Sequence, residues 1–304
     1  MSLGVCCHWL VNHNGKQKNA LNERALQLGR YRDGKYADEY VRGVYQSNLL
    51  NLSTVIDTVV SSKIKLFRIS SSLFPLADQV DRSLWDNEHT KSIAANIGEK
   101  IRVSGLRVTT HPGQFCVLSS DSDKTVENSV KELELHGWLF DQMGLARSPQ
   151  YCINVHGGKS DRSRSLINVI KSLPDSVRLR LTLENDETAY SAVDLLEVHT
   201  HTGVPIVWDS HHHSFNTGEL TELEAHEATL VTWPTGVKPL QHISNTEPGA
   251  GISFSERRKH SQMIHYVPSV QLTALRRNEI DVDVEAKQKN VAVFKMASDF
   301  SIPL

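Results

Sequence analysis

Apolar runs of strand length alternate with helical patterns along nearly the whole chain, and this alternation limits the folds open to it. Eight runs have strand character, and most are apolar on successive residues, which is typical of parallel strands buried on both faces. They are residues 3–7, 66–70, 106–110, 151–156, 177–183, 205–209, 239–244 and 280–285.

Amphipathic segments with the period of an α-helix lie between these runs. The predicted helices are residues 51–62, 92–103, 124–143, 162–173, 189–202, 220–230 and 287–298. Ser122 and Asp123 suit the N-cap of the third helix, and Gly203 suits the C-cap of the fifth. Residues 12–42 and 245–260 resemble loops and are expected on or near the catalytic rim, where they would bind substrate.

Eight strand–helix units in about 300 residues predict a protein of the α/β class, a (β/α)8 TIM barrel with its active site at the C-terminal rim of the strands. Because no linker rich in Pro, Gly or Ser divides the chain, residues 1–304 are expected to form a single domain. An open doubly wound sheet is the alternative, but its strand ends would not all converge.

Composition excludes several classes of protein. A net charge of −2 produces no global attraction to DNA or membranes, so a nucleic-acid partner needs a local basic groove. The four cysteines form no Cys-x-x-Cys motif and are interpreted as reduced thiols of a cytoplasmic protein. No signal peptide or apolar run of roughly 20 residues is present, so a membrane partner is not expected. A monomer is the default expectation.

Histidine is abundant, with 15 residues, and a His or a carboxylate stands at or just past the end of many predicted strands. In a barrel all these ends meet at one rim. The residues concerned are His111, His156, Glu184, Asp209, His212, His242 and Glu285. Imidazoles and carboxylates without thiolates suit Mn²⁺, Zn²⁺ or Fe²⁺. Two or three such ions, roughly 3.5–4 Å apart, can clamp a phosphodiester, activate water and stabilise the leaving oxygen.

Each of these residues also has an ordinary structural interpretation, such as a hydrogen-bonded histidine or a helix cap, and only the joint pattern indicates a metal site. Of the three consecutive histidines 211–213, at most two can point at one site, and His212 is favoured. Phe115 can enter a stacked duplex as a wedge beside Gln114. Burial of Phe115 in the core is the alternative. The short basic run of residues 257–259 is left without an assigned role.

These motifs resemble those of the UV damage endonuclease family of DNA repair enzymes. The likeness runs in order from about residue 3 to residue 298. It is carried by Phe67-Arg68-Ile69-Ser70-Ser71-Ser72-Leu73-Phe74-Pro75, His111-Pro112-Gly113-Gln114-Phe115, Asn154-Val155-His156-Gly157-Gly158, Leu183-Glu184-Asn185-Asp186, Asp209-Ser210-His211-His212 and Asp283-Val284-Glu285-Ala286-Lys287-Gln288-Lys289.

The resemblance implies a TIM barrel related in architecture to endonuclease IV, with up to three divalent ions. It implies incision of double-stranded DNA immediately 5′ of UV photoproducts, namely cyclobutane pyrimidine dimers and 6-4 photoproducts, leaving a 3′-hydroxyl and a 5′-phosphate. Mn²⁺ is the favoured ion, with Zn²⁺, Co²⁺ or Mg²⁺ as alternatives.

The residues that match the family's ligand positions are His111, His156, Glu184, Asp209, His212, His242, His260 and Glu285. Among them, Glu184, Asp209, His242 and Glu285 are expected to be catalytic. Gln114 and Phe115 match the pair that probes the lesion.

Two positions depart from the family pattern. Gln79 follows Asp78 where the family has a His, and Leu240 replaces a Lys that can carry a carboxyl modification near the metals. Lys238 lies too far along the strand to substitute for it. Because of these departures, the chain could be a divergent member of the family that binds damaged DNA but cuts it weakly or not at all. A sugar isomerase of the same barrel type is the other alternative, and it would show a closed, sugar-sized pocket.

Overall fold

Eight parallel strands form a closed barrel in the computed structural model, which describes residues 2–13, 16–20, 23–113 and 115–304. The strands pair in the ring order β1-β4-β5-β6-β7-β8-β9-β10, and β10 returns to β1. They are β1 (Ser2–Cys6), β4 (Leu66–Ile69), β5 (Arg107–Thr110), β6 (Ile153–His156), β7 (Leu181–Glu184), β8 (Ile206–Asp209), β9 (Leu240–Ile243) and β10 (Asp281–Val284). The TIM barrel expected from the sequence is therefore confirmed.

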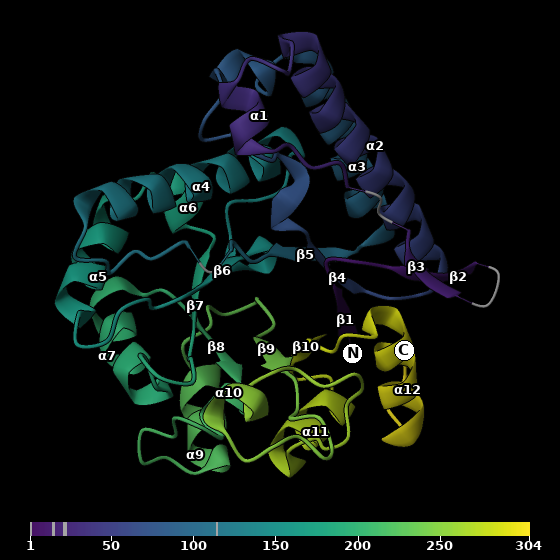
Figure 1. The fold of residues 1–304 in the computed structure, drawn as a ribbon. Coiled ribbons are helices and arrows are strands. Elements are labelled where there is room, and N and C mark those ends of the chain that lie inside the picture. The colour runs from purple at the N-terminus through teal and green to yellow at the C-terminus, as the bar shows by residue number, and fades with distance from the viewer. Residues whose placement is uncertain (1, 14–15, 21–22, 114) are drawn as a thin grey trace.

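Helices surround this barrel, as Figure 1 shows. The longer ones are α2 (Asp38–Ser61), α3 (Glu88–Ser104), α4 (Asp123–Gln142), α5 (Ser163–Ser172), α7 (Ala192–Thr202), α9 (Glu222–Leu230), α11 (Ser269–Arg276) and α12 (Lys289–Asp299). Short segments are α1 (Leu28–Arg32), α6 (Asp175–Arg178), α8 (Ser210–His213), α10 (Phe254–Arg257), η1 (Ser71–Leu73), η2 (Arg82–Leu84) and η3 (Pro149–Tyr151). A hairpin of β2 (Leu10–His13) and β3 (Lys16–Asn19) follows β1.

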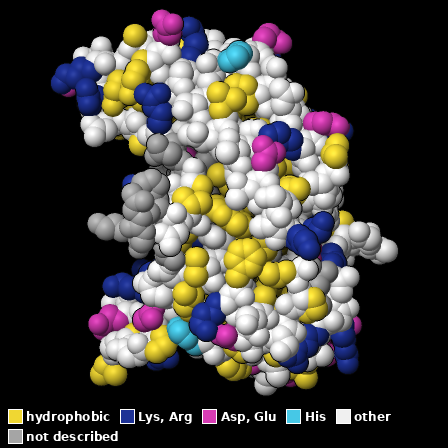
Figure 2. Space-filling view, turned by 90° about the vertical axis from the view of Figure 1, so that its right-hand side faces the viewer, with side chains coloured by type: hydrophobic (Ala, Val, Ile, Leu, Met, Phe, Trp, Pro, Cys, Tyr) yellow, Lys and Arg dark blue, Asp and Glu magenta, His cyan; other side chains and the backbone are white. Residues whose placement is uncertain are grey.

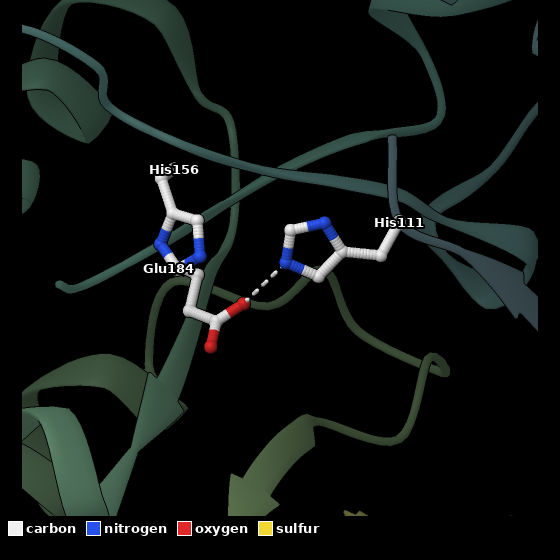
Figure 3. A group of neighbouring side chains, drawn as sticks. All are labelled: His111, His156 and Glu184. Atoms are coloured by element: carbon white, nitrogen blue, oxygen red, sulfur yellow. Dashed lines mark hydrogen bonds and ion pairs between the residues drawn. The ribbon is translucent and has the colours of Figure 1, made fainter. Parts of the chain in front are cut away.

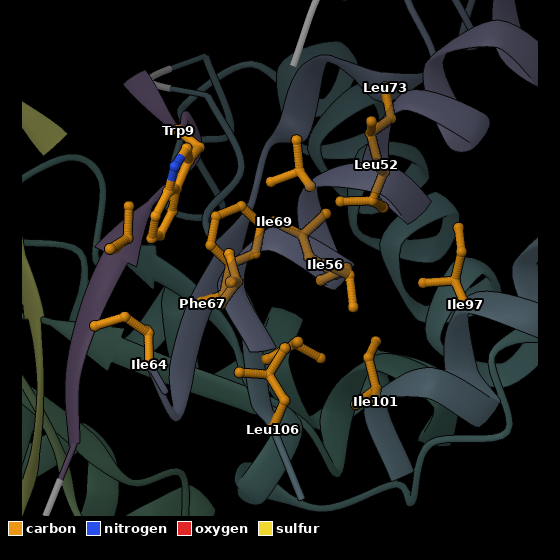
Figure 4. Packing of buried hydrophobic residues seen from close by; sticks show 14 of the residues in the cluster. Trp9, Leu52, Ile56, Ile64, Phe67, Ile69, Leu73, Ile97, Ile101 and Leu106 are labelled. Carbon is orange, nitrogen blue, oxygen red and sulfur yellow. The ribbon is translucent and has the colours of Figure 1, made fainter. Parts of the chain in front are cut away.

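The two-residue period of the strands separates the layers of the barrel. Outward side chains pack on helices: Phe67 and Ile69 of β4 belong to one buried cluster with Leu52 and Ile56 of α2 (Figure 4). Inward side chains change character along the strands. A small apolar cluster inside the barrel includes Leu66, Cys152, Val207 and Leu240. Two residues further along the same strands stand Arg68, Asn154, Asp209 and His242, all of them buried.

The predicted caps agree with the structure. The side chain of Ser122 accepts a hydrogen bond from the backbone N–H of Thr125 at the start of α4. Gly203 ends α7 with φ of 71°, in the left-handed region that glycine tolerates.

Two sequence-based boundaries were wrong. Residues 12–42 are not one loop, because they contain the β2–β3 hairpin, α1 and the first residues of α2. The buried positions Val41, Val44 and Tyr45 already follow the helical period there. The strand expected from residue 177 begins at Leu181, because residues 175–178 form α6 directly after Pro174.

Across the residues that the structure describes, none of the helices has both the length and the apolar character needed to cross a bilayer.

Candidate metal centre

Glu184 is the residue on which the site converges. It ends β7, is fully buried, and faces three histidines from other elements. Its Oε2 lies 3.1 Å from Nε2 of His111, while its Oε1 lies 3.0 Å from Nδ1 of His242 and 3.4 Å from Nδ1 of His212. Figure 3 shows the side chains of His111 and His156 directed toward this carboxylate. The amide of Asn154 also donates to Oε2, at 2.5 Å.

Three groups of side chains have the composition and spacing to hold a metal ion, and all of them share Glu184. They are His111–His156–Glu184, Glu184–Asp209–His212 and Glu184–His242–Glu285, with the ligand atoms of each group within 4.8 Å of one another. A carboxylate offers two oxygens, so Glu184 is suited to bridge neighbouring ions. Seven of the eight residues expected as ligands from the sequence therefore meet around one carboxylate.

His260, the eighth expected ligand, lies at the edge of these groups. Its Nδ1 is 3.6 Å from Oε2 of Glu285, and its ring is 6.3 Å from the ring of His212. It is half-buried, so it closes the cluster on the side of the loop that follows β9.

Backbone geometry orients the residues at the end of β8. Asp209 is the N-cap of α8, and its Oδ1 accepts hydrogen bonds from the backbone N–H groups of His211 and His212. Nδ1 of His212 lies 3.0 Å from the carbonyl oxygen of Asn185, which fixes the ring beside Glu184. His213 packs edge-on against Trp208, whereas His211 packs edge-on against Phe215 and its ring lies 6.1 Å from that of His260.

Arg68 belongs to the site in a way that the sequence analysis missed. It is only 6% exposed, its guanidinium is paired with Glu285, and its Nε lies 3.6 Å from Oδ2 of Asp283. It also donates to Sγ of Cys6 at 2.8 Å. Leu66 points into the barrel, and Arg68, two residues later on the same strand, points there too.

Charges within the cluster, together with burial, shift the pKa values of its side chains. Burial would raise the pKa of Glu184, yet His242 and His156 hold that pKa well below its usual range. Burial would lower the pKa of His212, but Asp209 and Glu184 raise it to about 10. Burial lowers the pKa of His156, which favours the neutral imidazole that binds metal ions.

Buried polar atoms in this layer are not satisfied by the protein. Within the described part of the chain, Nδ1 of His156, Oδ2 of Asp209, Nε2 of His242 and Oδ1 of Asp283 have no hydrogen-bond partner. Leaving such a group unpaired costs about 1–3 kcal/mol, so folded proteins rarely gather several of them. The donor set of imidazole nitrogens and carboxylate oxygens therefore fits divalent cations of the Mn²⁺ and Zn²⁺ type.

Phe115, four residues after His111, stands in solvent. Its side chain is 81% exposed, so the alternative that it belongs to the core was wrong. Gln114 lies outside the described residues. A cavity of about 280 Å³ lined by His111, His156 and Lys159 opens next to the metal groups, whereas a larger one of about 1050 Å³ runs along α4 and reaches Phe115. Figure 2 shows Lys and Arg side chains on both the upper and the lower part of this face.

The two departures from the family pattern lie at different depths. Gln79 is exposed and donates to its neighbour Asp78 at 2.6 Å, outside the metal groups. Leu240 is fully buried in the apolar layer, two residues before His242. Lys238 lies toward the opposite end of the barrel, with Nζ 3.3 Å from Oδ1 of Asp281, so it does not replace a lysine at position 240.

Comparison with known proteins identifies the family. The sequence model described as UV-endonuclease UvdE matches residues 1–302. The UV DNA damage endonuclease of Nostoc sp. is 38% identical over 269 residues, covering 85% of this chain and 79% of that protein. The protein of the same name from Deinococcus radiodurans is 34% identical over 287 residues, covering 91% of both.

Solved structures agree with this result. The crystal structure of SacUVDE superposes with a TM-score of 0.81 at 26% identity and covers 100% of both chains. A D-psicose 3-epimerase from Clostridium cellulolyticum H10 has a TM-score of 0.53 at 9% identity, covering 93% of this chain and 84% of its own, and it shares the fold alone. The chain therefore belongs to the UV-endonuclease UvdE family of enzymes.

Proposed function

We propose that this chain is a metal-dependent DNA repair endonuclease that cuts the phosphodiester backbone immediately 5′ of UV photoproducts. Cyclobutane pyrimidine dimers and 6-4 photoproducts are the proposed lesions, and the proposed products carry a 3′-hydroxyl and a 5′-phosphate. The observation that carries the proposal is the convergence of unsatisfied imidazoles and carboxylates on Glu184. The names of the Nostoc and Deinococcus relatives support it.

Two or three divalent ions would be held by His111, His156, Glu184, Asp209, His212, His242, His260 and Glu285, with Mn²⁺ first and Zn²⁺, Co²⁺ or Mg²⁺ as alternatives. Bound there, such ions supply an activated water and stabilise the charge of the departing oxygen. Glu184, Asp209, His242 and Glu285 are the proposed catalytic residues, and the Arg68 guanidinium balances part of their negative charge.

Recognition of the lesion is assigned to the loop between β5 and α4. A photodimer stacks poorly on its neighbours, which lowers the free energy needed to turn it out of the helix. The exposed ring of Phe115, together with Gln114, would occupy the gap that this leaves in the duplex.

The test uses a duplex with one photodimer at a known position, incubated with purified protein and Mn²⁺. We expect a single cut directly 5′ of the dimer, no cut in the lesion-free duplex, and loss of cutting in Glu184→Gln. End-group mapping by ligation and kinase labelling checks the 3′-hydroxyl and 5′-phosphate. Incision no greater than that of Glu184→Gln contradicts the proposal.

The same samples test the alternative that the chain binds damaged DNA without cutting it. The buried Leu240, which stands where the family has a Lys, is the reason to test it. Specific binding of the irradiated duplex without incision in Mn²⁺, Mg²⁺, Zn²⁺ or Co²⁺ would support a damage-binding protein instead.

We further propose that residues 1–304 act as one domain, as a monomer and in the cytoplasm. Light scattering of the purified chain checks the monomer.

A further inference from the structure

The loop between β9 and α11, residues 245–260, is held at the metal centre by both of its ends. It begins two residues after Ile243, the neighbour of His242, and it ends at His260, whose Nδ1 is 3.6 Å from Oε2 of Glu285. An isolated bridge between Thr246 and His260 joins the two ends. Both ends of the loop therefore lie beside the proposed ligands.

Hydrogen bonds fix the base of this loop. The side chain of Asn245 accepts hydrogen bonds from the N–H groups of His265 and Tyr266, at 2.6 and 3.0 Å. The hydroxyl of Thr246 donates to the carbonyl of Arg257 at 2.6 Å, and Glu247 accepts from the N–H of Gln262 at 2.5 Å. These bonds hold the base of the loop, and only the base, in place.

The tip of the loop exposes two large apolar side chains, a kind that folded proteins usually bury. Ile252 is 98% exposed, and Phe254, two residues later, is 45% exposed. Ile252 is thus available to a partner that approaches this loop.

Basic side chains surround this tip, while the acidic ones are turned to internal bonds. Glu256 is bonded to Ser253, and Glu247 to Gln262. The guanidinium of Arg257 lies 5.4 Å from the centre of the Phe215 ring, and no ion pair of Arg257 or Lys259 occurs among the described residues. With Arg258, the basic side chains of the loop outnumber its two acidic ones, so its net charge is positive, which suits a polyanion.

The strands that lead to this loop and to Phe115 lie opposite each other in the barrel. In the ring order of the barrel, β5 and β9 are separated by three strands on either side, so they face each other across the axis. Phe115 follows β5, and Ile252 follows β9. The strands that lead to these two exposed apolar side chains thus lie on opposite sides of the barrel axis.

We propose that residues 245–260 are a second DNA-contacting element, in which Ile252 enters the duplex from the side opposite Phe115 while Arg257 and Lys259 bind phosphates. This rests on the proposed function, since it names a further contact for the same substrate. Apolar side chains inserted between base steps hold a bent duplex in many DNA-binding proteins, with basic residues alongside. Two insertions across one site bend the duplex toward the metal groups.

The experiment measures binding by fluorescence anisotropy, with a labelled duplex that carries one photodimer and with every protein in a Glu184→Gln background, where the substrate stays uncut. Ile252→Asp should weaken binding about tenfold or more, since it replaces an apolar contact by a charge that repels the duplex. Arg257→Ala and Lys259→Ala should each reduce the salt dependence of binding by about one counterion.

Val231 provides the matched control. It is 82% exposed and follows α9, at the end of the barrel away from the rim, so Val231→Asp should bind as the parent does. Circular dichroism melting should be the same for both variants. If the parent binds the duplex and Ile252→Asp binds equally well, the inference is wrong while the proposed function stands. If the parent binds no duplex, both fail.

Discussion

At the scale of single residues, Arg68 shows how the barrel tolerates a cluster of buried carboxylates. Its guanidinium contacts Glu285 and lies near Asp283, both of which are removed from water. Burial raises the pKa of Asp283, while Arg68 and His242 oppose that effect. A buried carboxylate without a cation is strongly destabilising, so the arginine is needed before any metal arrives.

Replacement by an apolar side chain of similar length should expose this dependence. We expect Arg68→Met to lower the free energy of unfolding of the metal-free protein by about 3–5 kcal/mol, measured by urea denaturation. Added Mn²⁺ should recover more stability in the variant than in the parent, because the ions supply the missing charge. Arg102→Met, which breaks an exposed pair with Glu99, is the control and should change stability by less than about 1 kcal/mol. Equal losses in the two variants would count against this account of Arg68.

At the scale of elements, the loop between β5 and α4 depends on α4 for its position. The N–H of Gly113 donates to Oε1 of Glu132 at 3.1 Å, and the N–H of Val117 donates to Oγ of Ser129 at 2.8 Å. These two bonds fix the backbone on either side of Phe115. The exposed ring is therefore held in place by a helix that makes no proposed contact with the lesion.

Loss of the first bond should impair recognition without touching the metal groups. We expect Glu132→Ala to lower kcat/KM for the photodimer duplex about tenfold, since it frees the loop, while Glu132→Gln keeps an acceptor oxygen and stays within about twofold. Metal content, measured by mass spectrometry, should be the same in all three proteins. Identical kinetics for the two variants would show that the hydrogen bond does not position Phe115.

At the scale of the whole molecule, burial of histidines makes stability depend on pH. His136 on α4 is almost completely buried, and its burial, with a smaller effect of the charge on His111, lowers its pKa from 6.5 to about 4. Between these two values the unfolded chain binds a proton that the folded chain does not. Stability present above pH 6.5 is therefore lost as the pH falls toward 4.

A single replacement should isolate this contribution. Between pH 7 and pH 5, the parent should lose about 2 kcal/mol more unfolding free energy than His136→Gln, measured by urea denaturation at each pH. His89→Gln, at an exposed position of α3, should follow the parent. A parent and a His136→Gln variant with the same pH dependence would rule out this origin of acid sensitivity.

Much of the fold was predictable because it depends on local patterns. Continuous apolar runs and amphipathic segments alternate regularly, and the eight barrel strands, β1 and β4 to β10, lie within a few residues of their expected positions. The start of α2 at Asp38 was missed, since residues 28–42 are polar and only a few buried positions such as Val41 mark the helix. The start of β7 was misplaced because Val177 is apolar in either a strand or a buried turn of helix.

The set of candidate ligands could also be listed from the sequence, because a parallel barrel brings every strand end to one rim. What the linear chain alone determined is thus the order of strands and helices, the family, and the residue types delivered to that rim. Only the tertiary structure decided that Glu184 is the shared carboxylate, that Arg68 pairs with Glu285, and that Phe115 and Ile252 face solvent. Those facts depend on contacts between segments far apart in the chain, and no local pattern contains the distances between them.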